Sequence, residues 1–224
     1  MVREQNKEER RSRILGAAEK LIRELGTVEF SMRELAARAH ISHYTSYNLI
    51  GNKGTVLYTL LHRAIDRITN LPSQADPNFD PLSYAFDMGD LAVEFYVSDP
   101  DFFRPLLRFL FGVSDAELRP AFMNKGVRHW HAVALAIWQS GDLVGHVSPE
   151  DFASMINTYF GGALGLWSHD NIDAAVFFAH IRHAMAISLL ACGNKQWEAR
   201  LVAVGDCKDT GLCSQTARIS AQIC

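Results

Sequence analysis

Apolar residues in the first part of the chain recur at intervals of three and four positions. Between residues 8 and 25 these positions are Ile14, Ala17, Ala18, Leu21, Ile22 and Leu25. Intervening positions carry charged pairs four residues apart, Glu9 with Arg13 and Glu19 with Arg23. This period predicts an amphipathic α-helix that ends at Gly26.

Two further helix starts follow closely. Ser31 and Glu34 have the spacing of a capping box and predict a short helix over residues 32–39. Ser42 can cap another helix over residues 43–49. Two short helices behind a longer one are typical of a helix-turn-helix. The turn GNKG at residues 51–54 then precedes an apolar period that predicts a fourth helix.

The rest of the chain also shows only the signals of helices. Helix starts are expected at Asp99 with Pro100, at Ser114 with Glu117, and at Ser148 with Pro149 and Asp151. No turn dipeptide lies between alternating apolar runs, so β-structure is not expected. The prediction is therefore an all-α protein of roughly nine or ten helices.

A proline-bracketed segment, SQADPNFD between Pro72 and Pro81, is the predicted hinge between two domains. The predicted domains are a helix-turn-helix domain at residues 1–70 and a larger helical domain at residues 71–204. Residues 205–224 form a polar segment that is expected to be a disordered tail.

Charge is divided unevenly along the chain, although the net charge is only −3. Residues 1–68 contain 12 Lys and Arg against 8 Asp and Glu, whereas residues 69–224 contain 10 against 17. A basic first part suggests a polyanionic partner, and a solvated charged surface explains it equally well.

The cellular compartment is predicted to be the cytoplasm. No apolar run precedes Ile14, and no uninterrupted apolar stretch is long enough for a membrane span, so neither a secretory signal nor a membrane partner is expected. All four cysteines lie in the last 33 residues, which is not a disulfide framework.

The segment AHISHYTSYNLIGNKG, residues 39–54, contains no Asp or Glu. On a helix that begins near Ser42, His43 and Tyr47 share one face with Ser46 beside them, while Ile41 and Leu49 point inward. An α-helix fits the major groove of DNA, where hydroxyl and imidazole groups can bond to phosphates or base edges. The pattern therefore favours a DNA-binding helix.

Residues 8 to about 68 resemble the N-terminal domain of the TetR-type transcriptional repressors. The positions in register with that family's pattern are Ser31, Arg33, Leu35, Ala36, Ala39, Ile41, Ser42, Thr45, Tyr47, Ile50, Lys53 and Val56. The chain departs from the pattern at His40 and Tyr44, where the family has glycine, at Ser46, where it has an apolar residue, and at Leu49, where it has His or Tyr.

The resemblance implies a set of DNA-binding residues: Ser31, Arg33, Ser42, His43, Tyr44, Thr45, Tyr47 and Lys53. Arg33 and Thr45 would reach bases or backbone, Tyr47 and Lys53 would touch phosphates, and Ser31 would present a helix N-terminus to the backbone. Tyr44 would read a base or change the docking angle. Half-buried packing is the alternative for the tyrosines, and an ion pair with Glu29 or Glu34 is the alternative for Arg33.

In the family, the C-terminal part binds a small effector and forms a dimer. The aromatic residues that we expect to line an apolar effector pocket are Tyr96, Phe103, Phe109, Phe122, Trp130 and Trp138, and plain core packing is the alternative for each. Residues 149–167 and 174–191 are apolar on nearly every side, which favours a four-helix dimer interface. The candidate interface residues are Phe160, Gly161, Leu164, Trp167, Phe178, Ile181 and Met185.

No metal, cofactor or enzymatic activity is expected. His129 with His131, and His180 with His183, lack a carboxylate or cysteine that would complete a tetrahedral site. Cys207, Cys213 and Cys224 can bind zinc or sense redox state, but a disordered tail is the preferred interpretation. The usual catalytic and nucleotide-binding motifs are missing from the sequence.

The sequence thus predicts a dimeric repressor that binds a palindromic operator in double-stranded DNA and is released by a small apolar or aromatic effector. One alternative is a helical small-molecule-binding or catalytic protein whose N-terminal motif no longer binds DNA. Another is a DNA-binding protein without an effector.

Overall fold

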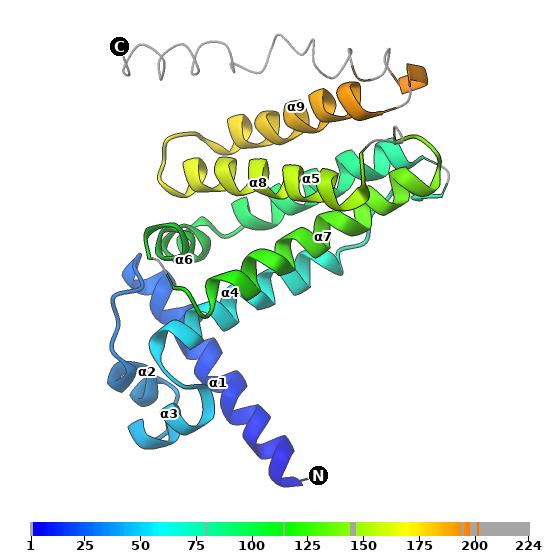
Figure 1. The fold of residues 1–224 in the computed structure, drawn as a ribbon. Helices are drawn as coiled ribbons and strands as arrows, with labels where there is room; N and C mark the ends of the chain where they lie inside the picture. The colour runs from blue at the N-terminus through cyan, green and yellow to red at the C-terminus, as the bar shows by residue number, and fades with distance from the viewer. Residues whose placement is uncertain are drawn as a thin grey trace. The chain divides into compact units, whose positions relative to one another are not determined.

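The computed structural model describes residues 2–78, 80–113, 115–143, 147–193, 195–197 and 201. Over these residues the chain forms nine α-helices, a single 3-10 turn and no β-strand, as the sequence predicted (Figure 1). The helices are α1 Val2–Leu25, α2 Met32–Arg38, α3 His43–Ile50, α4 Lys53–Thr69, α5 Pro81–Val97, α6 Pro100–Gly112, α7 Arg119–Gln139, α8 Pro149–Ser168 and α9 Ala174–Cys192.

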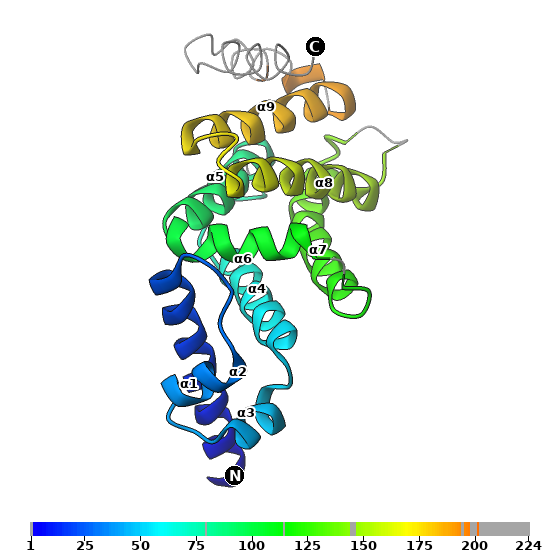
Figure 2. The same cartoon turned by 90° about the vertical axis from the view of Figure 1, so that its left-hand side faces the viewer.

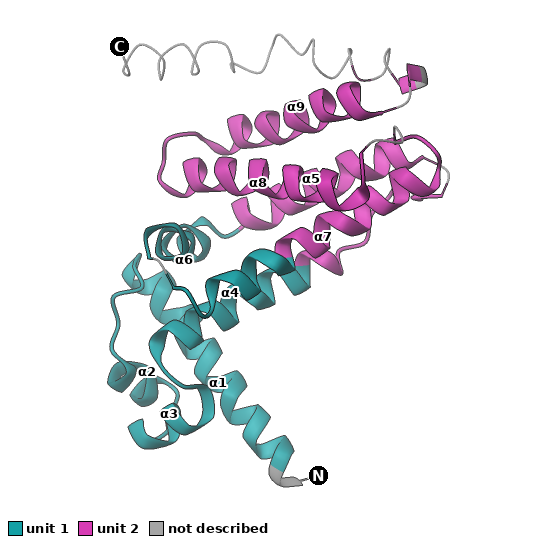
Figure 3. Cartoon of the chain, in the orientation of Figure 1, with its two compact units in different colours: residues 1–67, 99–125 teal, residues 68–98, 126–224 magenta. Residues whose placement is uncertain are grey.

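The helices fall into two compact units (Figure 3). Unit 1 comprises residues 1–67 and 99–125, and unit 2 comprises residues 68–98 and 126–224. The sequence placed the whole of residues 71–204 in the second domain, yet α6 and the start of α7 pack with the N-terminal helices. The functional division at residue 70 stays a prediction.

Unit 1 is built around α1, which contacts α2, α3 and α6. Its apolar stripe supplies the core, because Ile14, Ala18 and Ile22 are completely buried. At the far end, Arg23 donates two hydrogen bonds to Asp99 Oδ2, from Nε at 2.9 Å and Nη2 at 2.7 Å. The Arg23 guanidinium also lies 4.7 Å from the ring centroid of Phe102. These contacts fix α1 to the start of α6.

Unit 2 is a helical layer in which α9 packs against α5 and α8. Buried rings form a chain through its core: the centroid of Phe160 lies 5.3 Å from Trp130 and 5.6 Å from Phe177, and Trp167 stacks 6.0 Å from Phe177. At the surface, Arg182 donates to Asp90 from Nε at 3.0 Å and joins α9 to α5.

Helix starts follow the predicted chemistry at some positions and not at others. Ser148 caps α8 by accepting the backbone N–H of Asp151 at 3.1 Å. Asp99 precedes α6 as predicted but makes no side-chain cap bond, and its carboxylate instead accepts from Arg23. Ser114 and the three cysteines of the predicted tail lie outside the described residues.

Helix α9 is the one helix of the described residues that is long and apolar enough to cross a membrane. From the sequence no membrane span was expected, because no apolar stretch of sufficient length is uninterrupted. Core helices of proteins outside membranes pass the same test. Here 44% of the window is buried, and the helix packs on α5 and α8, which favours a core helix.

Candidate nucleic-acid interface

Helix α3 begins with a side-chain cap. Ser42 Oγ accepts the backbone N–H of Thr45 at 3.1 Å and lies 2.7 Å from the Thr45 hydroxyl oxygen. This cap satisfies an N–H group that would otherwise lack a partner at the helix start. Two of the predicted DNA-binding residues, Ser42 and Thr45, are therefore also the residues that fix the orientation of α3.

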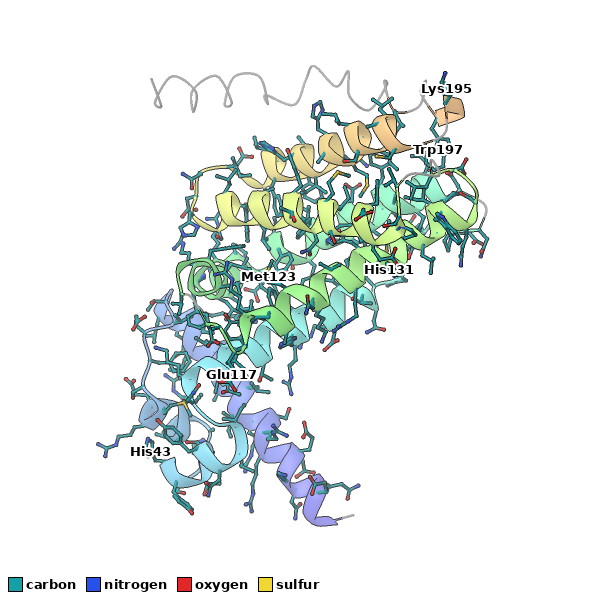
Figure 4. The ribbon with its side chains drawn as sticks, viewed as in Figure 1. His43, Glu117, Met123, His131, Lys195 and Trp197 are labelled. Carbon is teal, nitrogen blue, oxygen red and sulfur yellow. The ribbon has the colours of Figure 1, made fainter. Side chains whose placement is uncertain are left out.

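Three exposed side chains of α3 form what we call the recognition face: His43, which is labelled in Figure 4, Tyr44 and Tyr47. Tyr44 is 76% exposed and Tyr47 is 44% exposed. The rings of His43 and Tyr47 pack edge to face with centroids 4.9 Å apart. This pair holds two polar rings at the surface, and α3 carries no carboxylate that would repel a phosphate.

Ser46 does not belong to this face, and its expected position beside His43 and Tyr47 is wrong. Ser46 is completely buried. Its hydroxyl donates to the backbone carbonyl of His43 at 2.7 Å, so the side chain is satisfied within its own helix. This local bond lets serine occupy a position where the TetR pattern has an apolar residue.

The turn between α2 and α3 explains another departure. His40 has a φ of 54°, in the left-handed region that favours glycine. The N–H of His40 donates to Ala37 O at 3.1 Å, and that of Ile41 donates to Ala36 O at 3.0 Å. This is a Schellman motif, in which glycine is the preferred residue at the position that His40 occupies.

Helix α2 contributes Ser31 and Arg33. Ser31 and Glu34 form the predicted capping box: Glu34 N–H donates to Ser31 Oγ at 3.1 Å, and Ser31 N–H donates to Glu34 Oε2 at 2.7 Å. Hydrogen bonds from the Ser31 backbone and side chain lower the pKa of Glu34. Arg33 is exposed, and the structure shows no ion pair for it with any described residue, including Glu29 and Glu34.

Lys53 starts α4 and is turned toward its own unit. Its Nζ lies 3.7 Å from Glu29 Oε2 and 5.4 Å from the ring centroid of Phe30. Because 80% of the Glu29 side chain is exposed, this pair is weak and easily exchanged for another anion. Lys53 follows α3 closely in the chain, and its charge has only this exposed ion pair among the described residues.

The aromatic residues predicted for an effector pocket are divided between the units. Tyr96 and Trp130 of unit 2 both contact Phe160, at 6.2 Å and 5.3 Å between centroids. In unit 1, Phe109 and Phe122 both contact Tyr58, at 5.8 Å and 6.5 Å. Phe103, also of unit 1, packs against Phe102 at 4.9 Å, whereas Trp138 is 52% exposed.

A cavity of about 270 Å³ does open in unit 2. Its lining residues are Pro77, Asn78, Tyr84, Ala132, Leu135, Ala136, Gln139 and Ser140. None of the six predicted effector residues lines it. Burial raises the pKa of the Tyr84 phenol, so this hydroxyl stays protonated and can donate a hydrogen bond.

The residues predicted for a dimer interface lie mostly inside the protomer. Five of them have exposed fractions of 7% or less: Phe160, Leu164, Trp167, Ile181 and Met185. Gly161 and Phe178 are partly exposed. The large apolar side chains that α8 and α9 do expose are Met155, Tyr159, Leu166, Ile187 and Leu190.

In the part of the chain that the structure describes, histidines of the two predicted pairs contact polar side chains. His131 Nε2 lies 3.1 Å from Glu150 Oε1, and His180 Nδ1 lies 3.1 Å from the Tyr159 hydroxyl. His129 is buried, and burial lowers its pKa to about 4. Within the described residues, no three His, Cys, Asp or Glu side chains gather as a metal site would require.

The sequence matches no known family profile and no curated protein. Solved structures are similar to it. SmeT, the repressor of the Stenotrophomonas maltophilia multidrug efflux pump SmeDEF, is 18% identical, with 83% of this chain and 91% of SmeT covered and a TM-score of 0.59. A TetR transcriptional regulator from Rhodococcus sp. RHA1 is 18% identical, with 84% and 98% covered and a TM-score of 0.64.

A third structure has a bound ligand. Thermus thermophilus FadR, a TetR-family repressor solved in complex with lauroyl-CoA, is 19% identical, with 80% of this chain and 93% of FadR covered and a TM-score of 0.64. The fold is that of the TetR-family transcriptional regulators. SmeT has also been solved as a complex with triclosan.

Within this TetR fold, the residues in register with the family pattern lie on α2, α3 and the start of α4, or in the caps and the turn beside them. Sequence reasoning missed Asn52, whose Oδ1 accepts the N–H of Thr55 at 2.9 Å and so caps α4. It also missed Asp115, whose Oδ1 accepts the N–H of Leu118 at 2.7 Å just before α7. The signal available in the sequence was the residue type: Asn and Asp are preferred at the position just before a helix, where their side chains accept an N–H from three residues later.

Proposed function

We propose that the protein is a DNA-binding transcriptional regulator that reads the major groove with α3. The observation that carries this proposal is the recognition face: three polar rings, two of them on large exposed tyrosines, on a capped helix without carboxylates. Exposed aromatic rings are costly to leave in water, and here they lie where a groove and its phosphates could receive them.

The test is DNA binding by the full chain with and without the recognition face. The double variant Y44A/Y47A should bind a selected duplex at least about tenfold more weakly, equivalent to a loss of about 1.4 kcal/mol. The variant W138A is the control for the loss of an exposed aromatic ring, because Trp138 lies on α7 and is 52% exposed. Fluorescence anisotropy measures both affinities.

Salt dependence separates this function from the alternative of a protein that has lost DNA binding. Phosphate contacts release counterions. A plot of log affinity against log salt concentration should therefore have a negative slope of about 0.9 for each contact. Equal affinity for Y44A/Y47A and the wild type would refute the assignment of α3. A wild type that binds no duplex would refute DNA binding altogether.

A second copy of the chain is the proposed partner at α8 and α9. The exposed residues Leu166, Ile187 and Leu190 leave apolar surface on two helices whose inner faces are already filled. Two subunits related by a twofold axis would place two recognition helices about 34 Å apart, one helical turn of a palindromic operator. Light scattering of the purified chain measures the oligomeric state directly.

The proposed regulation is release from DNA by a small apolar or aromatic compound. This proposal is supported by other chains of this fold, since SmeT has been solved with triclosan and FadR with lauroyl-CoA. Here the buried aromatic core of unit 2 and the cavity beside Tyr84 supply apolar surface with a few polar groups. A compound that raises the melting temperature and also releases DNA would support this regulation. A broad panel without such a compound would favour a regulator that has no effector.

A further inference from the structure

The outward sides of α8 and α9 form one surface, which we call the outer face. Figures 1 and 2 both show the two helices side by side, and they pack on each other within unit 2. Side chains that are exposed or half-buried recur on each helix at intervals of three and four residues, as one side of a helix requires. They are Met155, Tyr159, Gly162 and Leu166 on α8, and His180, His183, Ile187 and Leu190 on α9.

Two histidines lie within this otherwise apolar surface. The hydroxyl oxygen of Tyr159 lies 3.1 Å from His180 Nδ1, and the two ring centroids are 6.5 Å apart. Since Tyr159 has Met155 and Leu166 on either side of it along α8, His180 lies near the middle of the outer face. His183 is exposed one turn farther along α9.

The outer face contains no carboxylate that could compensate a charged imidazole. Burial lowers the pKa of His180, and the nearby charge of His183 lowers it further. Burial raises the pKa of the tyrosines on α5 and α8, which are Tyr84, Tyr96 and Tyr159, so these phenols stay neutral.

Charged groups on the surrounding helices do not pair with the two histidines. Arg182 precedes His183 and donates to Asp90 of α5, so it adds a positive charge to α9. The other titratable residues of α5, α8 and α9 and their caps are Asp87, Glu94, Glu150, Asp151, His169, Asp173 and Cys192. None of them forms an ion pair with His180 or His183 among the described residues. A proton on either histidine would therefore be a charge without a partner.

We propose that the outer face is a pH-sensitive contact between two copies of the chain, which associate tightly only while His180 and His183 are neutral. The inference rests on the dimer of the proposed function and adds its regulation. A neutral outer face offers no fixed cation to an acidic partner and no carboxylate to a basic one. An apolar surface of the same kind matches it best, because the centres of protein interfaces are poor in charge.

Twofold symmetry increases the effect of protonation. Each copy brings the same two histidines, so acid would collect the charges of both pairs in one interface. A charge that is removed from water without a partner raises the free energy of the associated state. Separated copies therefore bind protons more readily than associated copies, and acid should favour separation.

The pH range follows from the ordinary pKa of histidine, about 6.5. Because the associated state has the lower histidine pKa, its stability is complete above that pH and is lost as the pH falls below it. Each proton taken up on separation raises the dissociation constant of the dimer about tenfold per pH unit. Between about pH 7.5 and 5.5 the constant should therefore rise at least about tenfold.

Sedimentation velocity of the full chain at about pH 7.5 and 5.5 measures this constant. The experiment compares H180Q/H183Q with H40Q/H131Q, which both replace two histidines by glutamine, a side chain that stays neutral at both pH values. His40 and His131 lie outside the outer face. Circular dichroism at both pH values shows whether each chain is folded.

The wild type and H40Q/H131Q should both lose affinity at least about tenfold at the lower pH. The dissociation constant of H180Q/H183Q should change by less than about twofold, because its outer face has no group left that takes up a proton.

A wild type with the same dissociation constant at both pH values would overturn the pH sensitivity while leaving the dimer in place. Equal pH dependence of H180Q/H183Q and the wild type would overturn it too, because other groups would then be titrating. A wild type that is monomeric at the higher pH would overturn the dimer and this inference together.

If H180Q/H183Q does not fold, H183Q alone decides, since His183 is exposed in the protomer. The pH dependence of H183Q should be weaker than that of the wild type, and an unchanged pH dependence would overturn the proposal.

Discussion

Replacing His40 with glycine should stabilise the protein, although it removes a large side chain. His40 occupies the Schellman turn between α2 and α3 with a φ of 54°. Its side chain is exposed, and the two hydrogen bonds of the turn come from backbone N–H groups. The substitution therefore removes backbone strain and breaks no bond that the turn depends on.

The magnitude follows from two opposing terms. A left-handed backbone costs an ordinary L-residue about 1–2 kcal/mol. Glycine avoids this cost but loses more chain entropy on folding, roughly 0.5–1 kcal/mol. The net gain for H40G is therefore about 0.5–1 kcal/mol. In a chain of this size, 1 kcal/mol corresponds to roughly 2–4 °C in melting temperature, so the expected rise is about 1–4 °C.

Urea unfolding and thermal melts of H40G measure this gain. The matched control is A37G, which places glycine three residues earlier at an exposed position of α2. Glycine in a helix costs about 1 kcal/mol relative to alanine, so A37G should have the opposite sign. H40A keeps a Cβ at the strained position and should bring no gain.

A stability of H40G equal to or below that of the wild type would refute this reasoning. The imidazole would then supply a contact that offsets the strain. A gain for both H40G and H40A would refute it differently, because the side chain rather than the backbone conformation would be the source of the cost.

Three further predictions concern other contacts of the two units. D99N removes the carboxylate that accepts both hydrogen bonds from Arg23, and should lower the free energy of unfolding by about 1 kcal/mol in urea titrations. Burial lowers the pKa of His129 in the folded protein to about 4. As the pH falls, the unfolded chain therefore binds a proton at this histidine before the folded protein does. The contribution of His129 to stability is complete above about pH 6.5 and is lost as the pH falls toward 4. The loss is roughly 3 kcal/mol at most, and H129F should remove that part of the slope. I187D/L190D should convert a dimer to a folded monomer in light scattering, since both residues are exposed in the protomer.

Local signals in the sequence were sufficient for the helix-turn-helix. The capping box at Ser31 and the cap at Ser42 each depend on residues three positions apart, so their geometry follows from the helix itself. The exposure of Tyr44 and Tyr47 follows from the same register. What forms within one or two turns of helix can be predicted without knowledge of the rest of the chain.

The composition of unit 1 could not be predicted in this way. The bonds that attach α6 to α1 join Arg23 and Asp99, which are 76 residues apart in sequence. The pairing of Arg23 with Glu19, four residues away, is the local expectation, and at 3.7 Å it is the longer of the two contacts. The choice between the two acids depends on how distant helices pack, which periodicity does not encode.

The inner and outer faces of α8 and α9 were ambiguous for a related reason. Both helices carry apolar residues on nearly every side, so hydrophobicity does not distinguish a core face from an exposed one. The predicted interface residues Phe160 and Trp167 instead pack among the buried aromatic rings of unit 2. Any surface between subunits must use the remaining apolar side chains, such as Ile187 and Leu190.

Ser46 shows why polarity is a poor guide to exposure on a short helix. A hydroxyl can bond to a carbonyl of its own preceding turn, as Ser46 does to His43, and it then enters the core at little cost. The hydroxyl of a tyrosine lies at the far end of its ring, away from the carbonyls of its own preceding turn, and cannot be satisfied in this way. A tyrosine exposed to 76% on a helix of eight residues is therefore stronger evidence for an external partner than any serine beside it. The assignment of α3 as the reading helix rests on the rings for this reason.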